Sequence, residues 1–311
     1  MKKKYLGIDI GGTAVKLGIV QEDGEIKARM ERSVSFDGYR TPILTTVLQA
    51  AEDFLKEQGI GTKDLEGIGV SATGQVDSLK GIIAGTGGNI PGWEGSPVGP
   101  ALHEKFGLPV TTANDANCMC LGEKWLGAGK DCNDFIGITI GTGIGGGIFT
   151  GGRILEGSRG LGGEIGHFMT HAGDGVVCSC RNRGCYERYA ATTALVRNAE
   201  KISPELTDGR AVFAAAQAGD ENVKKLLTDW IHEIAVGLIG LIHIFNPSMI
   251  LVGGGVSSQQ ELLIDPLAEE VKRMVMPAFA QGLEIRPAAL KNDAGLVGAV
   301  YYFMSNESGQ A

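Results

Sequence analysis

Three segments near the N-terminus alternate apolar residues with polar or small ones. They read YLGIDI, AVKLGIV and EIKARMERSV within residues 4–34, and Gly11-Gly12 and Asp23-Gly24 lie between them. Alternation with period two is typical of half-buried strands, and glycine-containing pairs between such runs are typical of tight turns. The pattern therefore predicts three consecutive strands joined by tight turns.

Helical and strand patterns alternate along the rest of the chain. Apolar residues with helical spacing occupy 41–58, and Pro42 lies near the first turn of this predicted helix. Shorter patterns predict, in chain order, a buried strand GIGVSA, a glycine-rich loop to Trp93, a helix VGPALHEKF, a strand PVTTA, a helix that opens with NDANCMC, helical stretches at 209–246, a strand SMILVGGGV, a helix near 259–275, a strand LEIRPAAL and a final helix at 295–306.

One strand-and-turn pattern occurs twice. Residues 6–12 read LGIDIGG and residues 136–142 read IGITIGT, and a second apolar strand follows each of them. Two such units about one domain apart suggest two related α/β halves. Because no linker rich in proline or serine separates the halves, we expect them to pack closely around one cleft.

Composition narrows the class of protein. The chain has 311 residues, 43% of them hydrophobic and 21% charged, and its net charge is −8. This balance is typical of a globular protein and disfavours non-specific nucleic-acid binding. We found no apolar run of membrane-spanning length and no signal peptide, so we expect a cytoplasmic protein without nucleic-acid or membrane partners. Its six cysteines are then expected as thiols or metal ligands.

The first glycine turn, DIGGT, carries candidate phosphate chemistry. The N–H groups of a tight turn at Gly11 and Gly12 can hold phosphate oxygens, and Thr13 adds a hydroxyl. Asp9 can hold a phosphate-bound Mg²⁺ through water. The alternative is a simple hairpin turn. The second copy, GTGIGGG at 141–147, favours a phosphate site because two such hairpins can face one nucleotide from two domains. The chain contains no P-loop motif.

Two further features bear on a nucleotide site. In VGGGVS, the glycines 253–255 would let a flat ring lie against the backbone, although a plain turn is the alternative. Lys16 can approach the phosphates, although a strand lysine with a solvated head is the simpler interpretation.

The segment ANDAN, at 113–117, lies at a predicted junction from strand to helix. A carboxylate there, Asp115, can accept a proton from a substrate hydroxyl while Asn114 positions that hydroxyl. The alternative is a helix N-cap, which is the commoner role of Asn and Asp at such a place. Both roles can hold at once, with either residue as the cap.

A cysteine cluster provides a candidate metal site. Cys178, Cys180 and Cys185 follow the pattern C-x-C-x₄-C, and His167 lies eleven residues upstream. Three Cys and one His complete a tetrahedral zinc set without an open position, which indicates a structural site. His171 is a competing ligand, and unrelated buried thiols are the alternative. The remaining cysteines are expected to be core thiols: Cys118, Cys120 and Cys132.

Together these segments resemble the ROK family of bacterial sugar kinases and related repressors. The resemblance covers essentially the whole chain and rests on DIGGT at 9–13, NDANC…LGE at 114–123, IGTGIGGGIFTGGRILEGSRGLGGEIGH at 140–167, and the cysteine segment that ends at Glu187. It implies an α/β, actin-like ATPase (ribonuclease H-like) fold of two domains with ATP in the cleft between them. The expected domains are a small one, 1–115 joined by a C-terminal helix at 293–311, and a large one with the zinc loop, 116–292.

The resemblance also implies roles for individual residues. Asp115 matches the catalytic base. The sugar-contacting positions of the family match Asn89, Asn114, Glu164, His167 and Glu187. The positions expected to bind ATP and Mg²⁺ are Asp9, Gly11, Gly12, Thr13, Lys16, Thr142, Gly143, Gly254 and Gly255. The expected ligands of a structural Zn²⁺ are His167, Cys178, Cys180 and Cys185, so His167 would use one ring nitrogen for the metal and the other for a sugar hydroxyl.

The same resemblance predicts the reaction ATP + hexose → ADP + hexose 6-phosphate. Glucose is the first choice of substrate, and N-acetylmannosamine and a β-glucoside are the alternatives. Thr73 stands where many glucose enzymes of the family carry Pro, and Arg181 stands where the family usually has Gly. If position 181 needs a positive φ, the arginine costs of order 1 kcal/mol.

Two other classes of protein could have the same fold and motifs. ROK repressors carry a helix-turn-helix domain before the first hairpin, and here that hairpin starts at residue 5, so we expect no repressor. A non-catalytic sugar-binding module is the other alternative, and the presence of Asp115 and both phosphate hairpins disfavours it. The resemblance further suggests a homodimer.

Overall fold

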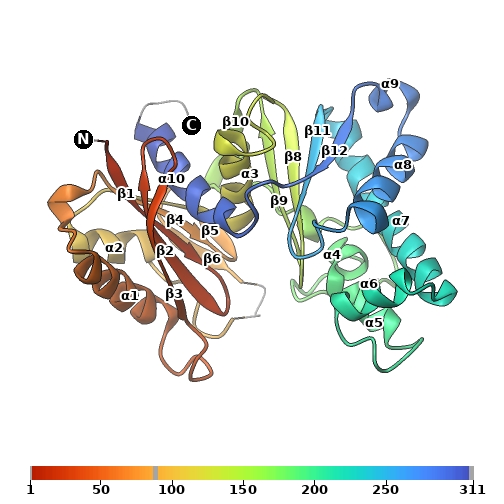
Figure 1. The fold of residues 1–311 in the computed structure, drawn as a ribbon, viewed down its shortest axis with the longest axis horizontal. Helices are drawn as coiled ribbons and strands as arrows, with labels where there is room; N and C mark the ends of the chain where they lie inside the picture. Colours follow the sequence, from red (N-terminus) through yellow and green to blue (C-terminus); the bar gives the residue numbers. More distant parts are fainter. Residues whose placement is uncertain (1, 87–89, 308–311) are drawn as a thin grey trace. The chain divides into compact units, whose positions relative to one another are not determined.

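The computed structural model describes residues 2–86 and 90–307, which form two compact units (Figure 1). The first unit comprises Met1–Lys130, Arg153–Gly163 and Asn292–Ala311, and the second comprises Asp131–Gly152 and Glu164–Lys291. The boundary expected after residue 115 lies inside the first unit. The helix that starts there stays with this unit because it packs against the C-terminal helix.

A five-stranded sheet in the order β3-β2-β1-β4-β7 forms the centre of the first unit. The strands β1 (Lys4–Ile10), β2 (Ala14–Gln21) and β3 (Ile26–Ser33) are antiparallel, which confirms the three strands predicted at the N-terminus. The strands β4 (Ile68–Ala72) and β7 (Val110–Asn114) are parallel to β1. Consequently, the carboxyl ends of β1, β4 and β7 lie at one edge of the sheet.

Helices cover both faces of this sheet. Along β1, Leu6, Ile8 and Ile10 join a large core cluster that includes helix α1 (Ile43–Gln58). Tyr5 points to the opposite face and joins a smaller cluster with α10 (Ala294–Glu307). Since strand side chains alternate between faces, Asp9 lies on the α10 side. The remaining helices of this unit are α2 (Val98–Phe106) and α3 (Asp115–Leu126).

Glycines allow α10 and α3 to approach closely. A Cβ added to Gly298 would lie 1.7 Å from the carbonyl oxygen of Cys118, and one added to Gly122 would lie 2.4 Å from that of Ala294. No real Cβ tolerates these separations, so the contact requires glycine on both helices. The C-terminal helix thereby supports the helix that begins with Asp115.

Short elements lie in segments where the sequence predicted only loops. The strands β5 (Gln75–Asp77) and β6 (Ile82–Gly85) form a small hairpin inside the predicted glycine-rich loop, and β10 (Arg153–Ile154) is also short. Gly74, with a φ of 98°, directly precedes β5, and Gly81, with a φ of 66°, directly precedes β6. Runs this short give too few positions for a period to be recognised. Single-turn segments lie at Thr62–Asp64, Gly157–Arg159, Ile165–His167, Gln260–Ile264 and Lys291–Asp293.

The second unit repeats the strand order of the first. Its strands follow the order β9-β8-β11-β12, namely β8 (Phe135–Ile140), β9 (Ile144–Thr150), β11 (Met249–Gly253) and β12 (Glu284–Pro287). β8 and β9 form an antiparallel hairpin, and β11 and β12 continue in parallel from β8. The order β2-β1-β4-β7 has the same pattern, so the sequence echo reflects two related halves.

Helices of the second unit include three that the sequence did not predict, namely α4 (Glu187–Ala190), α5 (Thr192–Ala199) and α9 (Pro277–Ala280). The others are α6 (Gly209–Gln217), α7 (Glu221–Phe245) and α8 (Asp265–Met274). The helical stretch predicted at 209–246 is broken into α6 and α7 because Gly219 has a φ of 96° between them.

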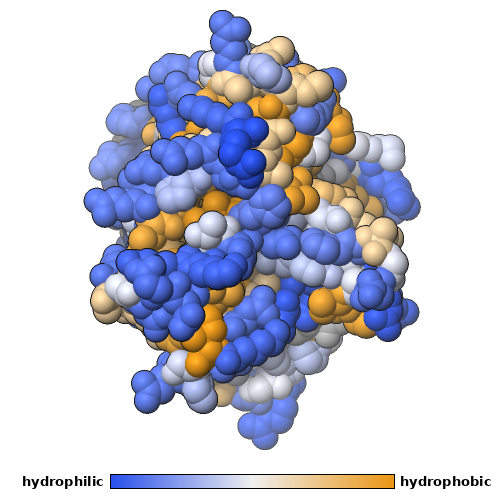
Figure 2. All heavy atoms as spheres, turned by 90° about the vertical axis from the view of Figure 1, so that its right-hand side faces the viewer, coloured by the Kyte–Doolittle hydropathy of each residue, from blue (hydrophilic) through white to orange (hydrophobic). Residues whose placement is uncertain are grey.

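Helix α7 is long and apolar enough to cross a membrane, and among the residues that the structure describes it is the one helix that meets this criterion. Half of its apolar window is buried inside the protein, and core helices of soluble proteins meet the same criterion. The expectation that no apolar run reaches this length is therefore wrong for α7. On the face shown in Figure 2, hydrophilic residues predominate and hydrophobic atoms occur in separate patches.

Candidate active site

The first glycine turn follows β1 and closes the hairpin with β2. Gly11 N–H donates to the carbonyl oxygen of Ala14 at 2.9 Å. Neither Gly11 nor Gly12 has a positive φ, and a Cβ added to either would meet no atom nearer than 3.4 Å. Folding therefore does not demand glycine at these two positions. The missing side chains leave the backbone open to a close approach by a ligand, as a phosphate cradle requires.

Asp9 lies one residue before this turn, and its partly buried carboxylate has polar neighbours. Ser71 Oγ donates to its Oδ1 at 2.7 Å, and Lys16 Nζ lies 3.7 Å from its Oδ2. Burial raises the pKa of the Asp9 carboxyl above its ordinary value of 3.8, and the contacts with Ser71 and Lys16 offset part of that rise. Lys16 thus contacts Asp9 rather than standing free in solvent.

Asn114 is the N-cap of α3, as one of the two sequence interpretations predicted. Its Oδ1 accepts hydrogen bonds from the N–H groups of Ala116 at 2.9 Å and Asn117 at 3.2 Å. Its Nδ2 donates to the carbonyl oxygen of Gly74 at 2.9 Å and to Oδ1 of Asp115 at 3.0 Å. The carboxylate of Asp115 is therefore held by its neighbour at the first position of the helix.

Strand register brings Asp115 and the first glycine turn to the same sheet edge. Ile10, the last residue of β1, pairs with Ala72, and Ala72 pairs with Asn114. Because neighbouring strands lie about 4.8 Å apart, the end of β1 and the start of α3 are about 10 Å apart across the sheet. A candidate base and a candidate phosphate cradle thus meet at the carboxyl ends of parallel strands, where α/β sheets bind their ligands.

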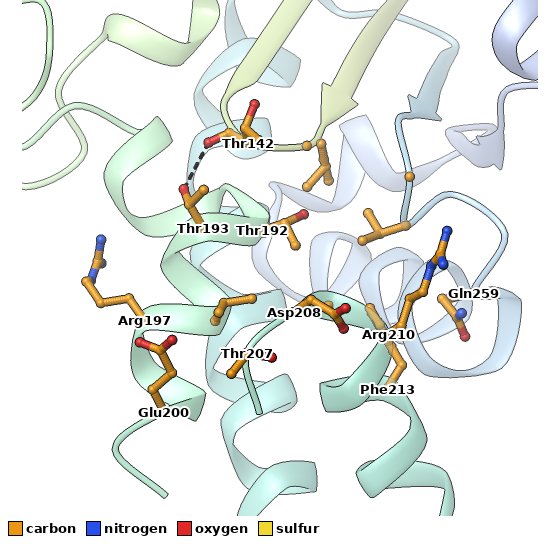
Figure 3. Close-up of a pocket in the computed structure, with 16 residues that line it drawn as sticks. Thr142, Thr192, Thr193, Arg197, Glu200, Thr207, Asp208, Arg210, Phe213 and Gln259 are labelled. Atoms are coloured by element: carbon orange, nitrogen blue, oxygen red, sulfur yellow. Dashed lines mark hydrogen bonds between the residues drawn. The ribbon is translucent and has the colours of Figure 1, made fainter. Parts of the chain in front are cut away.

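The second glycine turn contributes to a pocket of about 570 Å³ in the second unit (Figure 3). Gly141 and Thr142 line the pocket, and so does Gly255 from the turn after β11. Gly254 does not line the pocket, but it has a φ of 90° and shapes this turn. A Cβ added to Gly141 or Gly255 would meet nothing within 4 Å, so packing does not require glycine there. The volume lies in the range of small-molecule sites.

Helices α5 and α6 supply walls of this pocket that the sequence interpretation missed. Thr193 Oγ1 donates to the carbonyl oxygen of Thr142 at 2.9 Å, as Figure 3 shows. Thr192 Oγ1 is buried and, within the described part of the chain, has no hydrogen-bond partner. A bound ligand would supply one. The available signals were Thr192, the first residue of α5, and Asp208, the N-cap of α6, since both residue types favour helix starts.

Glu187 joins the cysteine segment to the second glycine turn. Its Oε2 accepts a hydrogen bond from Ile144 N–H at 3.1 Å. A Cβ added to Gly143 would lie 2.3 Å from the same oxygen, so a larger residue at this position would displace the Glu187 carboxylate. Burial raises the pKa of the Glu164 carboxyl; His167 lowers it and Glu187 raises it further. Three of the residues expected to contact sugar are therefore near one another.

The four predicted zinc ligands converge. The ligand atoms of His167, Cys178, Cys180 and Cys185 all lie within 4.8 Å of one another. Cys180 Sγ and Cys185 Sγ are 3.5 Å apart, and Cys178 Sγ is 3.6 Å from His167 Nδ1. Zn–S bonds of about 2.3 Å in a tetrahedron separate ligand atoms by roughly 3.8 Å, so the donor set fits zinc.

His171, the competing ligand, has other partners. Its Nε2 lies 3.5 Å from Glu233 Oε1, its Nδ1 lies 3.1 Å from Thr170 Oγ1, and its ring stacks on Tyr189 with centroids 3.7 Å apart. Both ring nitrogens of His171 therefore contact residues outside the cysteine cluster, which favours His167 as the fourth candidate ligand.

Arg181 has a φ of 74°, a positive value that is unfavourable for arginine.

Cys118 and Cys120 are fully buried, as expected of core thiols. Cys132 is half-buried, and its Sγ lies 3.0 Å from Ser248 Oγ. Asn89, the remaining predicted sugar contact, lies outside the described residues.

The chain is similar to known sugar kinases along nearly its whole length. The model of the ROK family matches residues 5–306. A glucokinase from Thermotoga maritima is 34% identical and covers 96% of both chains. A beta-glucoside kinase from Listeria monocytogenes is 36% identical and covers 98% of this chain and 99% of its own. A ROK family glucokinase from Streptomyces griseus, solved in complex with glucose and AMPPNP, superimposes with a TM-score of 0.80 at 32% identity and covers 95% of this chain and 97% of its own.

Proposed function

The chain belongs to the ROK family and is an ATP-dependent hexose kinase, and we propose that it transfers the γ-phosphate of ATP to the 6-hydroxyl of glucose. The family's actin-like ATPase fold of two domains is the fold class expected from the sequence. One observation carries the residue assignment: Ile10 and Asn114 pair with the same residue, Ala72, so the first glycine turn and Asp115 share one edge of the sheet.

Asp115 is the catalytic base in this proposal. It accepts the proton of the 6-hydroxyl as that oxygen attacks the γ-phosphate in line. Backbone N–H groups of the first glycine turn, other than the Gly11 N–H that donates to Ala14, stabilise the charge on the transferring group. Mg²⁺, when bound, would add to this stabilisation. Asp9 helps to place the metal, and its contact with Lys16 supports the ionised form that this role needs.

The pocket in the second unit binds the adenosine part of ATP in this proposal. Its open glycines, Gly141 and Gly255, permit a flat ring to lie against the backbone. The unpartnered hydroxyl of Thr192 is available to a ligand. Thr142, Gly143 and Gly254 belong to the two turns that shape this pocket.

A structural Zn²⁺ is held by His167, Cys178, Cys180 and Cys185 in this proposal. When bound, it supplies a rigid cross-link and no chemistry, because four protein ligands leave no open position. His167, through its Nε2, and the carboxylates of Glu164 and Glu187 contact the sugar hydroxyls. The cluster therefore orders the segment that carries them.

N-acetylmannosamine and a β-glucoside remain the alternative substrates, and the name of the Listeria relative favours the second of them. We place the enzyme in the cytoplasm, where the cysteine cluster stays reduced, and assign it a homodimer on family grounds.

An ADP-release assay tests the proposal. Mg·ATP would be supplied with glucose, mannose, N-acetylglucosamine, N-acetylmannosamine, fructose and cellobiose in turn. The proposal predicts the highest kcat/KM with glucose. A clear preference for N-acetylmannosamine or cellobiose would replace the substrate, and no turnover with any sugar would contradict the proposed acceptor class.

A further inference from the structure

The segment between β3 and α1 runs against the first glycine turn and fixes its carbonyl groups. Tyr39 Oη donates to the carbonyl oxygen of Gly12 at 2.8 Å. The carbonyl oxygen of Thr13, the next residue, accepts from Val34 N–H at 2.9 Å and from Ser33 Oγ at 3.3 Å. Two consecutive carbonyls of the turn are therefore hydrogen-bonded to this segment, and the end of β3 adds a further bond to the second of them.

Tyr39 adopts an unfavourable backbone conformation to make this contact. Its φ is 63°, in the left-handed region that a bulky aromatic residue rarely occupies. Non-glycine residues that persist there are held by their surroundings and cluster at functional sites. The sequence offers no local reason for the conformation, since Gly38, with a φ of 69°, already provides the tight turn.

The segment holds this conformation through its own hydrogen bonds. Asp37 Oδ2 accepts from Thr41 N–H at 2.9 Å and from Thr41 Oγ1 at 2.8 Å, and Arg40 Nε donates to the Asp37 carbonyl oxygen at 3.0 Å. The ring of Tyr39 packs at the margin of the large core cluster. The hydroxyl is thus delivered to the glycine turn from a fixed point.

A bound carbonyl fixes the direction of the following N–H group. The peptide between Gly12 and Thr13 is planar and trans, so its C=O and N–H point in opposite directions. When Tyr39 holds the C=O, the N–H of Thr13 is aimed away from Tyr39. Two adjacent glycines are otherwise free to rotate their peptide planes, and this freedom would have to be lost each time a phosphate bound.

We infer that Tyr39 is a positioning residue for phosphoryl transfer, which orients the Thr13 N–H toward the phosphates of the nucleotide. The inference rests on the proposed function and adds a residue to it. Tyr39 touches neither substrate nor metal in this scheme; it acts through the peptide that it holds. Its removal should therefore weaken interactions with the phosphate chain and leave the adenosine part and the sugar unaffected.

The test compares Tyr39→Phe with Tyr301→Phe, a matched loss of one hydroxyl on α10. The ring of Tyr301 stacks on Trp125 with centroids 5.5 Å apart, away from the glycine turn. Calorimetric titration would measure Mg·AMP-PNP and AMP binding to the wild type and both variants. We expect Tyr39→Phe to weaken Mg·AMP-PNP about three- to tenfold, the effect of one lost hydrogen bond, with AMP affinity unchanged and the melting temperature lowered by about 4 °C at most. Tyr301→Phe should change neither affinity.

Equal Mg·AMP-PNP affinity in Tyr39→Phe and the wild type would overturn the inference, and so would an equal loss for both ligands. Failure of the wild type to bind Mg·AMP-PNP would instead contradict the proposed function. In steady-state assays with the best sugar, Tyr39→Phe should raise KM for ATP and lower kcat while KM for the sugar stays constant.

Discussion

The side-chain amide of Asn114 donates to Oδ1 of Asp115 at 3.0 Å. The same amide caps α3 and binds the Gly74 carbonyl oxygen, so its four hydrogen-bonding positions are filled from within the chain. Asn114 therefore orients the proposed base directly. A sugar contact by Asn114 would have to replace or share one of these bonds.

Replacing Asn114 separates its two roles. Asn114→Ala should lower stability by about 1 kcal/mol through the lost cap and should also reduce kcat about tenfold or more, because Asp115 loses its donor. Asp220 caps α7 in the same way, through the N–H groups of Asn222 and Val223. Asp220→Ala is the matched control: it should lose similar stability and keep kcat.

Asn114→Ser completes this comparison, since serine can cap a helix but cannot reach Asp115 with an amide. It should recover most of the stability and little of the kcat. Full recovery of both in Asn114→Ser would show that the cap alone matters. Thermal denaturation and ADP release provide the two measurements.

The cysteine cluster predicts one zinc ion per chain. Cys178→Ser should abolish bound zinc and lower the melting temperature, because metal binding contributes directly to folding stability. It should also weaken sugar binding, since the proposed sugar contact His167 is itself a ligand and Glu187 follows Cys185 closely. Cys132→Ser lies outside the cluster and should keep zinc, stability and activity. Elemental analysis of the wild-type protein measures the zinc content per chain. Wild-type protein without zinc would contradict the proposed zinc site.

Arg181 offers a stabilising substitution inside the same segment. Its φ of 74° is unfavourable for arginine and neutral for glycine. Arg181→Gly should raise stability by about 0.5–1 kcal/mol, because the relief of strain exceeds the added flexibility of the unfolded chain. Chemical denaturation of the zinc-loaded protein measures this. A loss of stability would mean that the arginine side chain makes a compensating contact.

Asp9 is predicted to reduce stability at neutral pH. Burial raises the pKa of this carboxyl above 3.8, so the folded chain holds its proton more tightly than the unfolded chain. Proton binding by Asp9 therefore stabilises the fold. This contribution is fully present at pH values below the pKa of the carboxyl in the unfolded chain, and it is lost as the pH rises through the pKa in the folded chain. Asp9→Asn should therefore raise the melting temperature at pH 7, and the gain should shrink as the pH is lowered toward 4, although activity falls.

Asp77 provides the opposite control for this prediction. Its hydrogen bond and ion pair with Lys80 lower the pKa of the Asp77 carboxyl. Asp77→Asn should therefore lose a little stability at pH 7 rather than gain it. A loss of stability in Asp9→Asn of the same sign would contradict the account of the buried carboxylate.

Local patterns predicted those parts of the site that single segments encode. The spacing of the cysteines predicted that they converge with His167, and the motif at 113–117 gave Asn114 as a candidate cap. The two glycine turns were recognised because each follows a short buried strand and precedes a second apolar strand. In these cases the relevant neighbours lie in one short stretch of the chain, the longest running from His167 to Cys185.

Features that depend on residues far apart in the sequence were not predictable. The wall formed by α5 and α6 meets the turn after β8 only through tertiary packing, as the bond between Thr193 and Thr142 shows. The contact between Tyr39 and Gly12 likewise joins residues that no local pattern relates. The sequence predicted that Arg181 would be unfavourable if its φ were positive, but it could not predict the φ itself, because that angle depends on the folded loop.

The central claim is that Asp115 acts as the base, and Asp115→Asn tests it most directly. Sugar affinity, measured by calorimetry without nucleotide, and kcat, measured by ADP release, would be compared with the wild type. The account predicts that kcat falls by about 10²- to 10⁴-fold while the sugar Kd stays within about threefold. Retained turnover, or an equal loss of sugar binding and turnover, would contradict it.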